Sequence, residues 1–152
     1  MKRLAGLCVI LTVLAASWSV SAATSVGLAL GLDPTGLFIV SAMTEMSVSG
    51  DLDLRAEAGI ATDEIAGLML ATVTVLYHFP LEPFDPYLGL GGGLALTPPP
   101  FSTGAVAEAV GGVRIIPAEP FAIFGQIRYL VRWSGAGVTT GPIYEAGIQI
   151  RF

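Results

Sequence analysis

The C-terminal end of the chain alternates strictly between apolar and polar residues. One parity holds Tyr144, Ala146, Ile148, Ile150 and Phe152, and the other holds Glu145, Gln149 and Arg151. Successive side chains of a β-strand point to opposite faces, so a period of two predicts a strand with one apolar and one polar face. The sequence therefore has to build a sheet that separates two different environments.

The N-terminal end predicts a segment that is removed from the folded protein. Lys2 and Arg3 precede an almost wholly apolar run at 4–16, and small residues follow at Val20–Ala22. This order is typical of a secretory signal peptide. We expect a signal peptide at 1–22 and a single domain at 23–152. The only cysteine, Cys8, lies in the first segment, so no disulfide framework is expected in the second.

Charge and composition exclude several classes of protein. After residue 22, twelve acidic residues face five arginines and no lysine, which gives a net charge of −7. A nucleic-acid partner is not expected, because binding phosphates requires a basic surface. Charged residues are only 12% of the chain, about half the share that is usual in a soluble domain. The best candidate for a membrane-spanning helix, 65–77, is shorter than the roughly 20 residues that such a helix needs.

Turn residues divide the domain at fairly even intervals. Clusters of Gly, Pro, Asp and Ser predict seven turns or loops, including 80–86, 97–104 and 134–142. The segments between them predict eight strands at 25–32, 37–48, 51–60, 66–79, 87–96, 105–116, 121–133 and 142–152. An even number of antiparallel strands can close into a barrel and leave no unpaired backbone edge in lipid. The predicted fold is an all-β, eight-stranded antiparallel up-and-down transmembrane barrel.

The charged residues of individual strands share one parity, and we expect that face to line the lumen. A soluble, lipocalin-like barrel would place the charges outside instead. Small Gly, Ser and Thr residues on the charged faces, the absence of lysine and aromatic residues near strand ends favour the membrane alternative. Eight strands leave little interior space, so a salt-bridge network that fills the lumen is favoured over an ion-selective pore. The predicted network comprises Glu45, Arg55, Glu57, Glu108, Arg114, Arg128, Arg132, Glu145 and Arg151.

Two internal segments resemble known outer-membrane proteins. The segments 86–93 (PYLGLGGG) and 124–129 (FGQIRY) resemble the fifth and seventh strands of small eight-stranded barrels of the OmpA-like and OmpW-like kind. The resemblance implies a bacterial outer-membrane location, with membrane lipid and the barrel-assembly machinery as partners, and a monomer. It also implies that the last strand carries an assembly signal at Tyr144, Ile148, Ile150 and Phe152.

Sequence motifs that would indicate catalysis or the binding of a cofactor or metal are weak in this chain. The glycines at 89–93 do not have the GxGxxG spacing of a dinucleotide loop, because Leu94 stands where the third glycine would be. His78 is the only histidine, and Ser102 and Ser134 are predicted at the opposite rim, so no catalytic triad, zinc site or cofactor is expected. We therefore expect a structural or interaction protein rather than an enzyme.

A second functional hypothesis is a narrow transporter for small apolar solutes. This hypothesis rests on the leucines of the fifth predicted strand and on the apolar segment at 98–101 that follows them and would form a lip. The leucines are Leu88, Leu90, Leu94 and Leu96.

Overall fold

The computed structural model describes residues 23–62, 68–79, 81–97 and 102–152. The predicted signal peptide and the predicted apolar lip at 98–101 lie outside these ranges. Within them, no helix occurs that is long and apolar enough to cross a membrane. The strands are β1 (Ala23–Leu32), β2 (Phe38–Ser49), β3 (Leu52–Thr62), β4 (Leu68–His78), β5 (Phe84–Thr97), β6 (Ser102–Ala118), β7 (Phe121–Ser134) and β8 (Gly137–Arg151).

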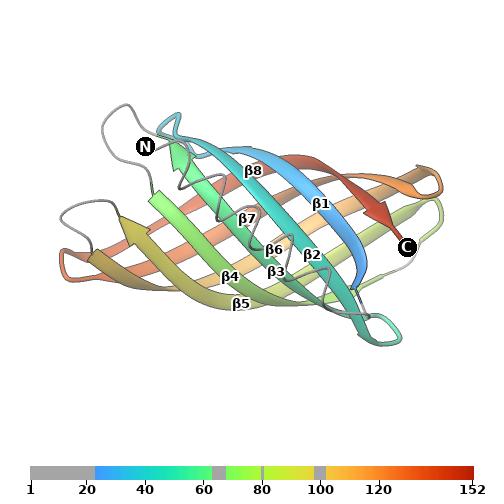
Figure 1. The fold of residues 1–152 in the computed structure, drawn as a ribbon, viewed down its shortest axis with the longest axis horizontal. Helices are drawn as coiled ribbons and strands as arrows, with labels where there is room; N and C mark the ends of the chain where they lie inside the picture. The colour runs from blue at the N-terminus through green and yellow to red at the C-terminus, as the bar shows by residue number, and fades with distance from the viewer. Residues whose placement is uncertain (1–22, 63–67, 80, 98–101) are drawn as a thin grey trace.

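The eight strands form one closed antiparallel barrel in sequence order (Figure 1). Each strand pairs with its neighbours in the chain, and β8 returns to pair with β1 from Ser25 opposite Arg151 to Leu32 opposite Tyr144. Closure satisfies the backbone groups that an open sheet would leave unpaired, which is the condition for crossing lipid with strands. The predicted fold class is confirmed.

Several predicted boundaries were wrong. The segment 134–142 was expected to be a loop, but β7 and β8 continue pairing up to Ser134 opposite Gly137. A tight hairpin needs only two connecting residues, so Gly135 and Ala136 are sufficient to join the strands. Gly137 has a φ angle of 124°, a backbone conformation that residues with a side chain rarely adopt. The predicted turn at 80–86 is also shorter, since β5 begins at Phe84.

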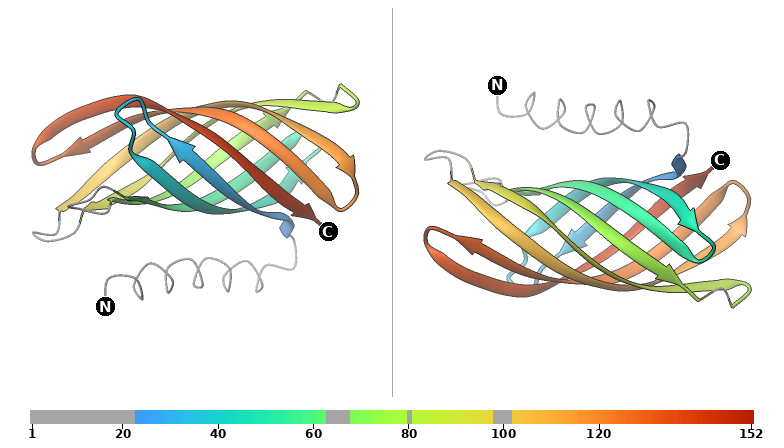
Figure 2. Two further views of the ribbon diagram at one scale, coloured as in Figure 1. Left: turned by 90° about the horizontal axis from the view of Figure 1, so that it is seen from above. Right: turned by 90° about the horizontal axis from the view of Figure 1, so that it is seen from below.

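The two ends of the barrel carry different connections (Figure 2). One end of the barrel, which we call the terminal end, holds the start of β1 and the end of β8. The connections 50–51 and 119–120 lie at the same end. The loop end is the opposite one, where 33–37 joins β1 to β2 and 135–136 joins β7 to β8.

Alternation along the strands gives the barrel an apolar outside and a mixed inside. The four leucines of β5 all face outward, with Leu88 60% and Leu90 72% exposed. The interposed glycines face inward, where space is short: a Cβ added to Gly93 would lie 1.9 Å from the carbonyl oxygen of Ala71. Because the leucines point away from the interior, β5 contributes no apolar lining to the lumen at these positions.

The outward face also carries aromatic residues towards both ends of the barrel. Tyr77 and Phe121 are about half exposed towards the terminal end, and Trp133 and Tyr144 towards the loop end. Tyr87 was one of the aromatic residues expected at the rim because it begins the strand predicted at 87–96, but this was wrong. It shares the inward parity of the β5 glycines and is 1% exposed. Most of the other large apolar residues on the outer surface are aliphatic, as expected for a barrel that faces lipid.

Candidate functional site: the barrel lumen

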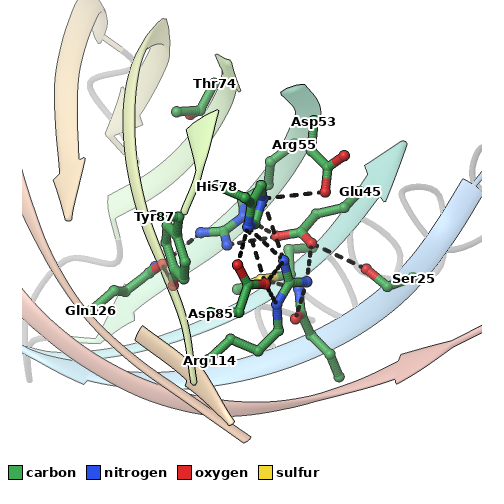
Figure 3. A network of polar contacts seen from close by, with 12 residues as sticks. Ser25, Glu45, Asp53, Arg55, Thr74, His78, Asp85, Tyr87, Arg114 and Gln126 are labelled. Atoms are coloured by element: carbon green, nitrogen blue, oxygen red, sulfur yellow. Dashed lines mark hydrogen bonds and ion pairs between the residues drawn. The ribbon is translucent and has the colours of Figure 1, made fainter. Parts of the chain in front are cut away.

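The lumen holds two connected groups of charged side chains, with an apolar layer above them at the loop end. All of these residues come from inward positions of the strands, so the period of two in the sequence brings them into one interior. The first group is built around Glu45 and lies towards the terminal end. The second group is built around Arg128 and lies deeper in the barrel. Figure 3 shows the first group from close by.

Glu45 of β2 accepts hydrogen bonds from two arginines. Arg55 of β3 donates through Nε at 2.8 Å and approaches the same oxygen through Nη2 at 2.6 Å. Arg114 of β6 donates through Nη1 to the other carboxylate oxygen at 2.8 Å, and the Ser25 hydroxyl donates to that oxygen at 3.3 Å. Glu45 is 1% exposed and Arg55 is 2% exposed. Both charges are therefore held away from water and depend on each other for stabilisation.

Arg55 also reaches the opposite wall of the barrel. Its Nη1 donates to the side-chain oxygen of Gln126 on β7 at 2.5 Å. The Tyr87 hydroxyl of β5 donates to the same oxygen at 2.8 Å, and the guanidinium carbon of Arg55 lies 5.1 Å from the centre of the Tyr87 ring. One arginine of β3 is thus in contact with strands on both sides of the lumen.

Arg128 of β7 meets three carboxylates. Its guanidinium is paired with Glu57 of β3, with Glu108 of β6 at 2.6 Å and with Glu145 of β8 at 3.1 Å. It also donates to the Thr72 hydroxyl of β4 at 3.3 Å. Arg128 is 2% exposed and the three glutamates are 5% exposed each. A buried guanidinium with several carboxylates around it uses the fork of donors that lysine lacks.

The terminal end of the lumen holds a histidine between two aspartates. His78 of β4 has Nε2 3.2 Å from Asp53 and Nδ1 3.0 Å from Asp85. Arg114 bridges to the same group, with Nε donating to Asp85 at 2.9 Å and Nη2 3.0 Å from His78 Nδ1. These residues line a cavity of about 560 Å³ that includes Arg151 at its edge.

The structure brings together seven of the nine residues predicted for the lumen network and separates two. Arg132 lies half-buried at the loop end, and Arg151 is exposed at the terminal end. Within the described part of the chain, neither makes an ion pair with a carboxylate. The expectation that all nine converge was therefore wrong for these two, because the charged rows extend beyond the ends of the close-packed middle.

Sequence reasoning missed two members of this interior, Asp85 and Tyr87. Asp85 was placed inside the turn predicted at 80–86 and Tyr87 at the first strand position after it, because Pro80, Pro83 and Pro86 suggested a long break in the chain. The sequence signal that could have found them is the period of two. Asp85 and Tyr87 stand at alternate positions in line with Gly89 and the inward glycines beyond it, so all of them lie on the same face of β5. Starting the predicted strand three residues earlier, at Phe84, would have included Asp85 and moved Tyr87 away from the strand end.

The residues of the predicted assembly signal lie on the outer surface. Tyr144 and Ile148 of β8 are 52% and 55% exposed, Ile150 is 41% exposed, and Phe152 is 83% exposed. Their role in assembly stays a prediction.

The described residues do not contain the geometry of a metal or nucleophilic site. They hold no group of three or more His, Cys, Asp and Glu side chains placed to bind a metal ion. His78 contacts aspartates and an arginine, and among described residues no serine or threonine hydroxyl hydrogen-bonds to it. What this arrangement does chemically is hold opposite charges together in a space that water barely reaches.

Comparison with known proteins gives structural matches only. No family model matches the sequence, and no curated protein matches it. Among solved structures, the chain is similar to Neisserial surface protein A (NspA), with 18% identity, 85% of this chain and 94% of that chain covered, and a TM-score of 0.66. It is similar to the N-terminal β-barrel domain of Pseudomonas aeruginosa OprF, with 12% identity, 86% and 98% covered, and a TM-score of 0.69.

A third match is the outer membrane enzyme PagL, with 12% identity, 84% and 99% covered, and a TM-score of 0.57. All three similarities concern the fold, which is that of small eight-stranded outer-membrane barrels. The expected outer-membrane location agrees with this fold and with the apolar outer surface. Because one of these neighbours is an enzyme, the fold by itself does not decide whether a barrel of this kind catalyses a reaction.

Proposed function

We propose that this chain is a structural outer-membrane protein, a monomeric barrel whose lumen is filled by a polar network and which has no catalytic activity of its own. The observation that carries the proposal is the cross-lumen bonding of two arginines. Arg128 contacts side chains from β3, β4, β6 and β8, and Arg55 contacts side chains from β2, β5 and β7. Side chains that join opposite walls occupy the path that an ion would need.

Physical considerations favour a plug over a channel. Eight strands enclose an interior just wide enough for side chains, so a continuous water path requires small residues along the whole axis. Here the middle of the barrel holds Arg55 and Arg128, both almost fully buried. Each buried arginine is hydrogen-bonded to at least one carboxylate, which supports a rigid interior rather than a set of mobile gating groups.

Conductance tests the absence of a pore. We expect the protein at 23–152, refolded into a planar lipid bilayer, to give no discrete conductance steps. Arg128→Ser should introduce small steps if it folds, because it removes the guanidinium that joins β7 to side chains of β3, β4, β6 and β8. Arg132→Ser is the matched control and should stay silent, since Arg132 lies outside the buried network. Regular open-channel steps from the unmodified protein would contradict the proposal.

The proposed location and partners follow from the same surface. Apolar side chains cover the outside, so membrane lipid is the expected surrounding, and strand pairing from β1 round to β8 leaves no free edge for a second copy to extend. We expect the protein in the outer-membrane fraction, released only by detergent, and migrating faster on SDS gels before heating than after. Release by osmotic shock alone would rule out membrane insertion.

The proposed absence of catalysis is tested with lipid A, the outer-membrane lipid that some eight-stranded barrel enzymes modify. Lipid A from a deletion strain and from a strain that overproduces the protein should have the same mass spectrum. A reproducible mass difference that is abolished by His78→Asn would overturn this part of the proposal and leave the structural part standing.

A further inference from the structure

The loop end of the barrel contains an apolar pocket that the polar network does not use. Its volume is about 410 Å³. Its walls and floor are formed by inward side chains of several strands and of the 33–37 loop, principally Leu37, Ile39, Leu68, Leu70, Leu130 and Ile143. Ile39, Leu70 and Ile143 are 5% exposed or less, so the floor is well packed. Below it, Arg128 lies one inward position from Leu130 along β7, and the pocket ends there.

The pocket is lined by a cation, Arg132, that has no ion pair with any described residue. Arg132 lines it two residues beyond Leu130 on β7, and its Nε donates to the Thr139 hydroxyl of β8 at 3.2 Å. Among the described residues, no carboxylate lies within ion-pair distance of it, whereas Arg55, Arg114 and Arg128 each have at least one. The guanidinium therefore keeps donors available beside an apolar floor.

The acidic residue among the described residues that line the pocket is already engaged. Asp33 also lines the pocket, but its carboxylate accepts hydrogen bonds from the Thr35 backbone N–H at 2.8 Å, the Thr35 hydroxyl at 2.6 Å and the Leu37 backbone N–H at 2.9 Å. All of these donors belong to its own loop. Asp33 thus fixes the rim of the pocket, and among the described lining residues the charge without an ion-pair partner is the positive charge of Arg132.

We propose that this pocket binds a free single-chain carboxylate amphiphile of medium length, with its tail on the apolar floor and its carboxylate on Arg132. The volume of the pocket limits the length of the ligand's tail. At about 30 Å³ for each water-sized group, 410 Å³ holds roughly a dozen such groups, which matches the heavy atoms of decanoate and is too small for a lipid with two full acyl chains. The charge sets the head group, because an arginine fork binds a carboxylate bidentately.

Binding of decanoate tests the proposal directly. The protein at 23–152 is reconstituted in lipid nanodiscs, and heats of binding are measured against empty nanodiscs so that partitioning into lipid is subtracted. We expect saturable binding of one decanoate per barrel. Decyltrimethylammonium, which has the same tail and the opposite charge, should bind at least tenfold more weakly, since it gains nothing from Arg132 and is repelled by it.

Two arginine variants separate the pocket from general electrostatics. Arg132→Gln should weaken decanoate binding about tenfold or more, because a charge-assisted bond to the head group is lost. Arg151→Gln removes the same charge from the opposite end of the barrel and should leave the affinity unchanged. Both residues lie outside the buried network, so both variants should keep the heat-modifiable migration of a folded barrel.

A third variant tests the tail site. Leu130→Trp places a larger side chain on the pocket wall and should abolish saturable binding of decanoate with the barrel still folded. The proposal is overturned if the unmodified protein shows no saturable binding, if the two arginine variants lose affinity equally, or if decyltrimethylammonium binds as tightly as decanoate. The plug proposal has its own test in conductance, and its outcome does not depend on these results.

Discussion

Replacing Arg128 with leucine should destabilise the barrel more than any change at its outer surface. The structure places three carboxylates around this one guanidinium, all in positions with little access to water. Removing one partner of a buried ion pair costs about 3–5 kcal/mol, because the remaining charge is left uncompensated. In Arg128→Leu, Glu57, Glu108 and Glu145 lose their shared cation together, so we expect a loss at the upper end of that range.

Urea unfolding measures this loss. Trp133 is the only tryptophan after residue 22, and it faces outward near the loop end, so its fluorescence reports on insertion into lipid vesicles. With a slope of roughly 2 kcal/mol per molar urea, a loss of about 4 kcal/mol lowers the midpoint by about 2 M. Arg132→Leu, four residues further along β7 than Arg128, should cost less than about 1 kcal/mol because its charge is partly solvated.

The double variant identifies the mechanism. Adding Glu145→Leu to Arg128→Leu removes one of the uncompensated carboxylates, so part of the lost stability should return. The coupling between the two sites should be about 0.5–3 kcal/mol, as found for residues in one network. If the two single effects simply add, or if Arg128→Leu costs no more than Arg132→Leu, then the buried network does not stabilise the barrel in the way argued above.

Three further changes test other parts of the structure. Deletion of Phe152 should cause periplasmic accumulation and proteolysis while refolding in detergent stays nearly intact, since β8 pairs up to Arg151 without it; normal assembly of the truncated chain would refute the assembly-signal prediction. Gly93→Val should block closure or shift the folded band on SDS gels, because the new Cβ meets the Ala71 backbone, whereas Gly135→Ala has open space and should be silent. His78→Ala leaves Asp53 and Asp85 without their shared partner and should lower stability by about 1–3 kcal/mol in the same urea assay.

The alternation of the sequence was sufficient to predict the architecture. A shift of one residue in a strand would move every charged side chain to the lipid face, so each strand with charges of a single parity had only one acceptable orientation. Glu45, Arg55 and Glu57 show this directly: their odd positions on β2 and β3 require the same inward face, and the structure has them there. The errors concern strand ends, where Gly and Pro indicated loops that were longer than the chain needs.

The partners within the lumen could only be found from the tertiary structure. Parity says that Arg128 points inward, but the stagger between strands decides which inward residues lie at the same height. The closed barrel brings Arg128 to Glu57, 71 positions away in the chain, and to Glu145 and Glu108 from its neighbours. Four residues further along the same strand, the same rule of alternation places Arg132 beside apolar side chains instead. Sequence determines the face of each residue because the pleat is local, and the fold determines its neighbours because closure and stagger are properties of all eight strands together.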